Sequence, residues 1–373
     1  MSEPIRILQV VSGMERGGIE NMLMNVFRKI DRNEVMFDFL IHAEKEAEFE
    51  KEIAALDGRI YRLPEKRSVK SFFSYMRELE KFFSAHGEYR IVHCHMNALS
   101  VFPLFAAKRA KVPVRIAHSH TTKSSGKQKA AVKSFLKLFI NRFCNYRFAC
   151  SEGAGRYLFG RRMLESGKVT VIKNGVDCER FAFDEEKRRS MKKALSLFDC
   201  DVVLCHAGRF DRYKNQRFVL EILNELKKSG VKAKAVLLGE GEDFEKVKAF
   251  SKKLSLEKSV IFPGVVSNVS NYLQAADVFV FPSLFEGLPL TLIEAQANGL
   301  SVFASSAVSA ECNVCETVRF LPLEYGAKFW ADEIKSAMPF ERADNGKKIR
   351  KAGYDSAQGA EEIKNFYLEK WCL

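Results

Sequence analysis

The sequence of 373 residues lacks several features that would place it in a specialised class. It has no apolar run of the ~18 residues that a membrane-spanning helix needs. Its first ten residues, MSEPIRILQV, carry neither a basic segment nor a small-residue cleavage site, so we expect a strand there rather than a signal peptide. Nine cysteines, an odd number without regular spacing, favour reduced thiols and a cytoplasmic protein.

Motifs for metal and nucleic-acid binding are also missing. Cys312 and Cys315 have the spacing of zinc ligands, but no second pair accompanies them. Asp199 and Asp201 have the spacing of a divalent-cation site, but they precede a predicted strand and so belong to the wrong end of a parallel sheet. No helix-turn-helix, zinc finger or aromatic RNA-reading motif occurs. We therefore assign no metal ligands here and expect no nucleic-acid partner.

The sequence does contain the alternation typical of an α/β protein. Apolar, β-rich runs alternate with helical patterns, which predicts parallel sheets covered by helices on both faces. The expected strands are Ile5–Val11, Val35–Ile41, Ile91–His93, Val114–Ala117, Arg147–Ala149, Val202–Ala207, Lys234–Leu238, Val260–Phe262, Val278–Phe281 and Val302–Ala304. The chain is too long for one ordinary core, and Asn174-Gly175 is a strong turn signal. We therefore expect two domains, 1–173 and 174–355.

A basic segment accounts for much of the net charge of +13. Between Lys123 and Arg162 there are ten lysines and arginines and one acid, Glu152. Apolar residues recur at helical spacing with lysines beside them: Val132, Phe135, Leu136, Phe139, Ile140 and Phe143, with Lys129, Lys133 and Lys137. Such a helix could lie on an anionic membrane surface or pack its apolar stripe against the core, and the sequence leaves both open.

Cationic residues follow the strand Val202–Ala207. Open parallel sheets bind ligands beyond the carboxyl ends of their strands, so this position is informative. Arg209 offers a rigid fork for phosphate oxygens, Lys214 adds a mobile charge, and the next helix begins near Asn215 with free N–H groups. Two solvated cations on a basic protein would look the same.

A second loop, after Val278–Phe281, leads into a helix whose first position suits Pro289. Glu286 lies in this loop, and Gly287 allows close backbone approach. The first N–H groups of the helix, those of Leu290 and Thr291, are unpaired donors.

Glu294 lies in the second turn of the same helix, among apolar neighbours. A carboxylate in such surroundings usually needs a partner, because burying it unpaired is costly. Together with Glu286 it favours a site for a polyhydroxylated ligand that carries phosphate, rather than an acidic loop with one solvated helix residue.

The first half carries glycines and histidines after its strands. Gly17 and Gly18 follow Ile5–Val11 and open a helix, but the G-x-G-x-x-G spacing of a dinucleotide fingerprint is absent. The histidines end neighbouring strands, two on each, and alternate residues of a strand share a face: His93, His95, His118 and His120. They could bind zinc or iron, line a carbohydrate cleft or be satisfied buried residues; no acidic ligand accompanies them, which disfavours a metal.

These motifs resemble the retaining glycosyltransferases of family four, and most closely the bacterial exopolysaccharide and capsule branch. The resemblance covers nearly the whole chain, and its most specific elements are the E-x7-E motif, Glu286 with Glu294, and the pair Arg209 and Lys214. The weaker elements are Gly17-Gly18-Ile19-Glu20, His93-Cys94-His95, Ala117-His118-Ser119-His120-Thr121, Asn174-Gly175-Val176-Asp177 and Leu238-Gly239-Glu240-Gly241.

The resemblance implies the GT-B fold, in which two Rossmann-like domains face each other across a cleft. The N-terminal domain would bind the acceptor and the C-terminal domain the nucleotide sugar, while a helix within 356–373 would return to the N-terminal domain. It also implies a cytoplasmic enzyme, peripheral on the membrane's inner face if the basic helix binds there, that transfers a hexosyl or N-acetylhexosaminyl group without metal or cofactor. The donor would be a nucleotide sugar, usually a UDP-sugar, and the acceptor a glycan or a polyprenyl-linked glycan.

The resemblance also implies roles for single residues. Arg209 and Lys214 would bind the donor diphosphate and stabilise the leaving group, and Glu286 would contact the sugar near the reacting carbon. Glu294 would accept hydrogen bonds from the ribose, and His120 would line the sugar site. The remaining expected donor contacts are Gly17, Gly18, Gly239, Gly241, Gly287, Leu288, Leu290 and Thr291.

The chain departs from the family pattern in two places. Gly299-Leu300-Ser301 stands where Gly-x-Pro is common, and Ser305–Ser309 replaces a frequent glycine-rich turn. Three alternatives stay open: a GT-B sugar-nucleotide epimerase, a histidine-ligated metal hydrolase, and a non-catalytic basic module for membrane or nucleic acid.

Overall fold

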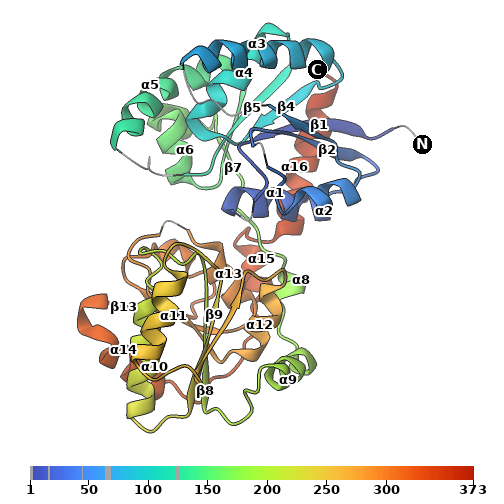
Figure 1. Cartoon of the computed structure of the whole chain (residues 1–373). Helices are drawn as coiled ribbons and strands as arrows, with labels where there is room; N and C mark the ends of the chain where they lie inside the picture. The colour runs from blue at the N-terminus through green and yellow to red at the C-terminus, as the bar shows by residue number, and fades with distance from the viewer. Residues whose placement is uncertain (1–2, 16, 44, 64–68, 122–126, 287) are drawn as a thin grey trace. The chain divides into compact units, whose positions relative to one another are not determined.

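The computed structural model describes residues 3–373 except 16, 44, 64–68, 122–126 and 287, and it describes no side chains of residues 69–72 and 127–130. The chain forms two compact units (Figure 1). The first comprises Met1–Gly175 together with Ser356–Leu373, and the second comprises Val176–Asp355. The first boundary thus follows Gly175, whereas the sequence placed it after residue 173.

The first unit is built on seven parallel strands in the order β3-β2-β1-β4-β5-β6-β7. These are β1 (Ile5–Val11), β2 (Val35–Ile41), β3 (Ile60–Arg62), β4 (Ile91–Cys94), β5 (Val114–Ser119), β6 (Tyr146–Ala149) and β7 (Thr170–Val171). All seven residues of β2 are buried, because helices cover both faces of the sheet. Its one charged residue, Asp38, accepts hydrogen bonds from Arg6 and from the hydroxyl of Tyr89.

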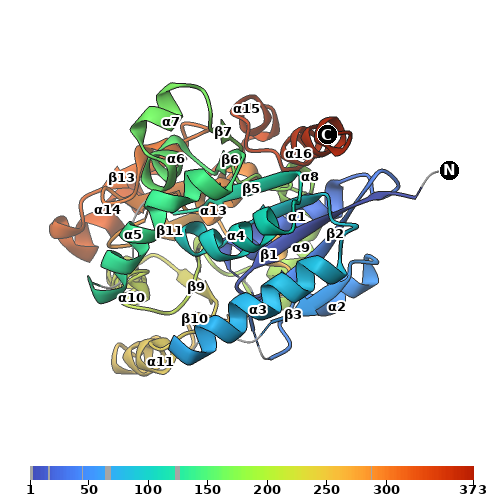
Figure 2. The ribbon, with the colours of Figure 1, turned by 90° about the horizontal axis from the view of Figure 1, so that it is seen from above.

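Helices cover both faces of this first sheet (Figure 1). One face is covered by α1 (Gly18–Lys29), α2 (Glu50–Ala55) and α16 (Ser356–Trp371). The other is covered by α3 (Val69–Ala85), η1 (Asn97–Ser100), α4 (Val101–Arg109), α5 (Lys127–Phe143), α6 (Glu152–Phe159) and α7 (Arg161–Glu165). Figure 2 shows α3, α4 and α5 together on that second face. The C-terminal helix α16 therefore packs on the first unit.

The second unit has six parallel strands in the order β10-β9-β8-β11-β12-β13. They are β8 (Val202–Ala207), β9 (Ala233–Leu238), β10 (Val260–Gly264), β11 (Val278–Phe281), β12 (Ser301–Ser305) and β13 (Val318–Leu321). One face packs on α8 (Cys178–Phe181), α9 (Glu185–Ala194), α12 (Val269–Ala275), α13 (Leu290–Ala297) and α15 (Gly346–Lys351). The other packs on α10 (Gln216–Lys228), α11 (Phe244–Lys253) and α14 (Gly326–Ser336), and the short helices η2 (Ala310–Cys312) and η3 (Leu323–Tyr325) lie in connections.

The two sheets share one topology. In each, the first strand lies between two strands that follow it in sequence, β1 between β2 and β4, and β8 between β9 and β11. The order therefore reverses at the first strand, which is the Rossmann arrangement, and ligands in such sheets bind at this point beyond the carboxyl ends. The predicted α/β architecture of two Rossmann-like domains is confirmed.

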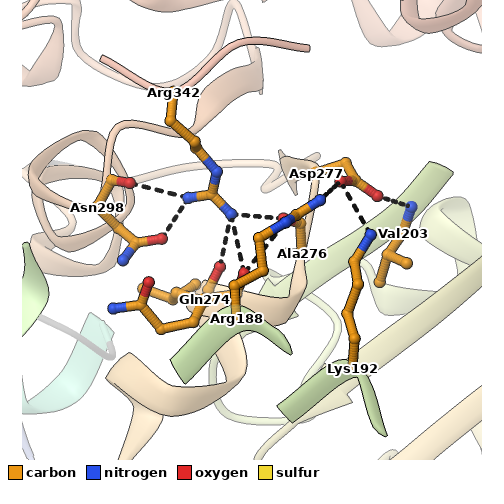
Figure 3. A network of polar contacts seen from close by, with 9 residues as sticks. Arg188, Lys192, Val203, Gln274, Ala276, Asp277, Asn298 and Arg342 are labelled. Carbon is orange, nitrogen blue, oxygen red and sulfur yellow. Dashed lines mark hydrogen bonds and ion pairs between the residues drawn. The ribbon is translucent and has the colours of Figure 1, made fainter. Parts of the chain in front are cut away.

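A charged network joins helices to the amino ends of the second sheet (Figure 3). Asp277 accepts a hydrogen bond of 2.7 Å from the backbone N–H of Val203 and ion pairs with Arg188 and Lys192 of α9. Arg342 donates to the backbone carbonyls of Leu273, Gln274, Ala276 and Asn298, three of which lie at the end of α12. Burial lowers the pKa of the Arg342 guanidinium, and the charge of Arg188 lowers it further.

Two remaining features concern helices and cysteines. Across the described residues, every helix is too short or too polar to span a bilayer. All nine cysteines are free thiols, and Cys312 and Cys315 pack within the core of the second unit.

Candidate active site

The loop after β8 presents two of the predicted cations. The Asp211 carboxylate accepts hydrogen bonds from the N–H groups of Tyr213 at 2.8 Å and Lys214 at 3.0 Å, which turns the chain back toward the sheet. Asn215 has the left-handed conformation, with φ of 57°, and α10 begins one residue later, at Gln216. The side chain of Arg209 is exposed, and among the described residues it makes no hydrogen bond or ion pair.

Gly239 and Gly241 let the loop after β9 pack against the loop after β8. A Cβ on Gly239 would lie 2.2 Å from the carbonyl oxygen of Gly208, and one on Gly241 would lie 2.3 Å from that of Phe210. Both glycines have positive φ, +118° and +157°. Packing between these two loops therefore requires glycine at both positions, whether or not a ligand touches them.

Glu286 and Lys214, both predicted site residues, form an ion pair. Lys214 Nζ lies 2.7 Å from Glu286 Oε1 and 4.7 Å from the ring centroid of Phe281, the last residue of β11. Both side chains are mostly buried, with 17% and 23% of their surfaces exposed. The sheet thus brings together a cation from the loop after β8 and a carboxylate from the loop after the neighbouring strand β11, as the strand-end rule predicts.

Among the described residues, no side chain caps the start of α13. The helix begins at Leu290, one residue later than the sequence indicated, with Pro289 as its N-cap and no side-chain cap. The hydroxyl oxygen of Thr291 is buried without a hydrogen-bond partner among the described residues. Leu288 and Leu290 are partly buried against the core of the unit, and Gly287 lies outside the described residues.

Glu294 is a carboxylate without a partner in its unit's described residues. It lies in the second turn of α13, and burial raises its pKa to about 7. The charge of Arg180 in α8 opposes this shift, although its guanidinium donates to the Ser267 carbonyl rather than to Glu294. Sequence reasoning did not identify Arg180, because the Asn-Gly-Val-Asp segment before it carried no signal of proximity to α13.

Further buried polar atoms without partners lie near the carboxyl ends of β8 and β11. Within the described residues these are His206 Nε2, Gln216 Oε1, Ser283 Oγ and Thr291 Oγ1. Native proteins pair almost all buried polar groups, so a cluster of unpaired ones marks a place where a ligand or ordered water completes the bonding.

The first unit contributes the glycine turn before α1. Gly17 is the N-cap of α1, where a Cβ would lie 2.2 Å from the Glu20 carboxylate. A Cβ on Gly18 would meet open space, so a ligand could approach the backbone there. Burial raises the pKa of Glu20, whose side chain folds back toward the helix start.

The four histidines at the ends of β4 and β5 lie together, as predicted from their spacing. The rings of His93 and His95 stack at 4.2 Å between centroids, and those of His118 and His120 at 4.1 Å. Burial lowers the pKa of all four imidazoles, that of His120 to about 3. The network is therefore neutral near pH 7 and lies in the core between the sheet, α1 and α16, around a cavity of about 10 Å³.

The histidine cluster includes a possible metal-binding group. Ligand atoms of His93, His95 and His118 lie within 4.8 Å of one another, and all three are buried. Three imidazoles suit zinc, which usually takes four ligands. Most of their ring nitrogens already hydrogen-bond to each other or to neighbouring side chains, so a metal would have to replace those bonds.

The basic helix α5 divides its apolar residues between two sides. Leu136 and Ile140 are buried in the core. Val132, Phe135 and Leu138 are exposed over 60%, 60% and 74% of their surfaces. The core therefore accounts for only part of the apolar stripe. Lys123 lies outside the described residues, as do the side chains of Lys127 and Lys129.

Two doubly wound domains, with a C-terminal helix that returns to the first, define a GT-B protein. Anabaena Alr3699/HepE, solved in complex with UDP and glucose, has this fold: it is 19% identical, with a TM-score of 0.78, over 98% of this chain and 100% of that one. Residues 16–180 match the family model "Glycosyltransferase Family 4", and residues 187–351 match "Glycosyl transferases group 1".

The chain belongs to the family-four glycosyltransferases. It is 32% identical to a putative glycosyltransferase, EpsF, of Bacillus subtilis over 97% of this chain and 96% of that protein. It is 27% identical to the capsular polysaccharide biosynthesis glycosyltransferase CapH of Staphylococcus aureus, over 98% and 99%. This membership does not favour the epimerase, the metal hydrolase or the non-catalytic module.

Proposed function

We propose that this glycosyltransferase moves a hexosyl or N-acetylhexosaminyl group from a UDP-sugar to a glycan or polyprenyl-linked glycan during surface polysaccharide synthesis, with retention of configuration and without metal. The observation that carries the proposal is Glu294, which has no hydrogen-bond partner in the described part of the chain and lies on the helix whose uncapped start is at Leu290. A nucleotide sugar supplies what these groups need, ribose hydroxyls for a carboxylate and phosphate oxygens for a helix start. Uridine is the usual base in the branch that the sequence resembles.

The ion pair of Lys214 and Glu286 suggests how the chemical step proceeds. The bond from the anomeric carbon to the diphosphate breaks while the acceptor oxygen bonds to the same face, and the acceptor proton passes to the departing phosphate oxygen. Lys214 and Arg209 would neutralise the charge that develops on the diphosphate, which is the part that a metal plays in other enzymes. Glu286 holds Lys214 in place and would contact the sugar.

A panel of nucleotide sugars, each with and without magnesium, tests the donor and the metal independence together. A bound ligand raises the unfolding temperature by mass action, so one UDP-sugar should stabilise the protein equally with magnesium or with a chelator. Transfer by that donor to a lipid-linked or free glycan should form a bond of unchanged anomeric configuration, read by NMR. Stabilisation that requires magnesium, or an inverted product, would refute these parts of the proposal.

The exposed apolar face of α5 supports a membrane-bound acceptor. Phe135 and Phe139 contact each other on this surface, 5.1 Å between ring centroids, with Lys133 on the same helix. Apolar side chains beside lysines suit the interface of an anionic bilayer, where a polyprenyl-linked glycan would present its sugar. We propose that this face docks on the inner membrane surface.

Vesicle flotation tests the docking. Binding to vesicles of anionic phospholipid should occur at low salt and weaken at high salt. Replacing Phe135 and Leu138 with serine should abolish it, whereas Phe198→Ser, at an exposed phenylalanine of the second unit, should leave it unchanged. Equal binding to neutral and anionic vesicles, or loss in both variants, would contradict the docking face.

A further inference from the structure

A continuous chain of hydrogen bonds runs through the histidine cluster. On one arm, His118 Nδ1 lies 3.1 Å from His93 Nε2, and His93 Nδ1 lies 2.6 Å from the hydroxyl of Tyr367 on α16. Gln9 of β1 continues the chain, with its Nε2 3.2 Å from the same hydroxyl. The C-terminal helix is thereby bonded into the carboxyl end of the first sheet.

The second arm leads from Gln9 to the predicted sugar-site residue. Gln9 Oε1 lies 2.9 Å from His95 Nε2, and His95 Nδ1 lies 3.0 Å from His120 Nε2. The chain ends on both arms at ring nitrogens that are buried and lack partners in the described residues, His118 Nε2 and His120 Nδ1.

A neutral imidazole has one N–H, so the direction of one bond sets the direction of every other bond in the chain. The distances at Tyr367 decide it. A separation of 2.6 Å is typical of an O–H donor, and one of 3.2 Å fits an N–H donor better. Tyr367 therefore donates to His93, and the Gln9 amide donates to Tyr367. Burial raises the pKa of Tyr367 and keeps its hydroxyl protonated.

The direction of the hydrogen bonds determines whether the terminal nitrogen of His120 is a donor or an acceptor. Because Gln9 donates through Nε2, its Oε1 accepts from His95 Nε2–H, and His95 Nδ1 accepts from His120 Nε2–H. The free nitrogen of His120, Nδ1, is then an unprotonated acceptor. An acceptor binds a hydroxyl, whereas it repels the oxygen of a phosphate.

We propose that Tyr367 and Gln9 are positioning residues that keep Nδ1 of His120 unprotonated, so that it accepts a hydrogen bond from a sugar hydroxyl. The proposal rests on the transferase function above and refines it: Nδ1 of His120 binds a sugar hydroxyl and does not bind a phosphate oxygen. In this proposal α16 also orients the histidines through Tyr367, in addition to packing on the sheet.

The direction of the chain is measured on the unaltered protein without any ligand. Nitrogen NMR of the full chain with labelled histidines should show Nδ1 of His120 unprotonated and Nε2 protonated between pH 6 and 8. Tyr367→Phe removes the donor to His93 and also the acceptor that orients the Gln9 amide. The amide can then turn over, so the two tautomers of His120 should mix. A protonated Nδ1 in the unaltered protein, or stoichiometric metal on His93, His95 and His118, would overturn the proposal.

Kinetics then separate positioning from packing. Tyr367→Phe should lower kcat/KM for the UDP-sugar about tenfold, as one lost hydrogen bond does, and leave the Kd of UDP unchanged because UDP lacks the sugar. The matched control is Tyr75→Phe, which removes another buried hydroxyl bonded to a histidine, His42, at 2.9 Å. The two variants should lose similar thermal stability, and the control should keep its kcat/KM.

Failure of the positioning role and failure of the proposed transferase function give different results. Equal kcat/KM losses in the two variants would show a merely structural role for Tyr367. If no nucleotide sugar binds the unaltered protein, the proposed function fails, and the sugar contact with it. The NMR measurement still decides the direction of the hydrogen-bond chain.

Discussion

Two buried polar networks, one in each unit, differ in how completely their bonds are satisfied. The arginine network of the second unit lies at the amino ends of its strands (Figure 3), where both carboxylate oxygens of Asp277 accept hydrogen bonds and both terminal nitrogens of the Arg342 guanidinium donate them. The histidine chain of the first unit lies at the carboxyl ends of β4 and β5, and its two terminal nitrogens are unpartnered among the described residues.

The completeness of the hydrogen bonding distinguishes a network that stabilises the fold from a network that binds a ligand. A charged group buried with all its partners holds helices to a sheet and offers nothing to a ligand. A neutral network that ends in unpaired atoms costs stability, and proteins keep such atoms where a ligand completes them. The same contrast recurs within the second unit, where Glu294 and the hydroxyl of Thr291, at the other end of the sheet, have no hydrogen-bond partner in the part of the chain that the structure describes.

The largest effect expected from this comparison is on stability. Arg342→Ala leaves carbonyls at the end of α12 and at Asn298 without their donor, so we expect a loss of roughly 3 kcal/mol in the free energy of unfolding. Denaturant unfolding measures it, and Arg342→Lys, which keeps the charge but not the fork, should lose less. Turnover of the folded fraction should be unchanged. A variant with full stability and lost turnover would show that Arg342 serves binding or catalysis rather than the stability of the fold.

The next effect is on catalysis. Arg209→Ala and Glu286→Ala should each lower kcat at least ~100-fold, because they remove contacts that stabilise the transition state. Arg209 is exposed and forms no ion pair in the described chain, so its loss should leave the unfolding free energy unchanged. Arg212→Ala is the matched control, since this arginine is exposed in the same loop and lies over the ring of Tyr213. Equal rates in the Arg209 and Arg212 variants would remove Arg209 from the site.

The central strands were predictable because their apolar pattern is unambiguous. Val35–Ile41 and Val202–Ala207 are buried over their full length, and their predicted bounds match the structure. Three short edge strands, β3, β7 and β13, were not among the expected strands. Two of them carry exposed arginines, Arg62 and Arg319. An edge strand owes its pairing to the strand beside it rather than to its own composition.

The sequence predicted after which strands the site residues lie, but not how their side chains pair. Parallel topology places Lys214 and Glu286 at the ends of adjacent strands, and the motif spacing indicated both. Their 2.7 Å ion pair depends on side-chain rotamers, which are set by packing in the folded protein and cannot be read from the sequence pattern. The bond from Tyr367 to His93 joins residues 274 positions apart, so only the packing of α16 on the sheet reveals it.

The smallest effect expected is a pH dependence of nucleotide binding that arises from Glu294. Burial raises the pKa of Glu294 in the free protein to about 7, above its ordinary value. The contribution of Glu294 to the free energy of unfolding is therefore present at low pH and lost as pH rises through 7. If the carboxylate accepts ribose hydroxyls, UDP should bind more tightly as pH rises from 6 to 8. Glu294→Gln should weaken binding about tenfold at pH 8, abolish the pH dependence and stabilise the free protein there. Calorimetric titration across this range checks the two binding results, and denaturant unfolding at pH 8 checks the stability. Tighter binding at pH 6 than at pH 8 would mean that the neutral acid, not the carboxylate, contacts the nucleotide.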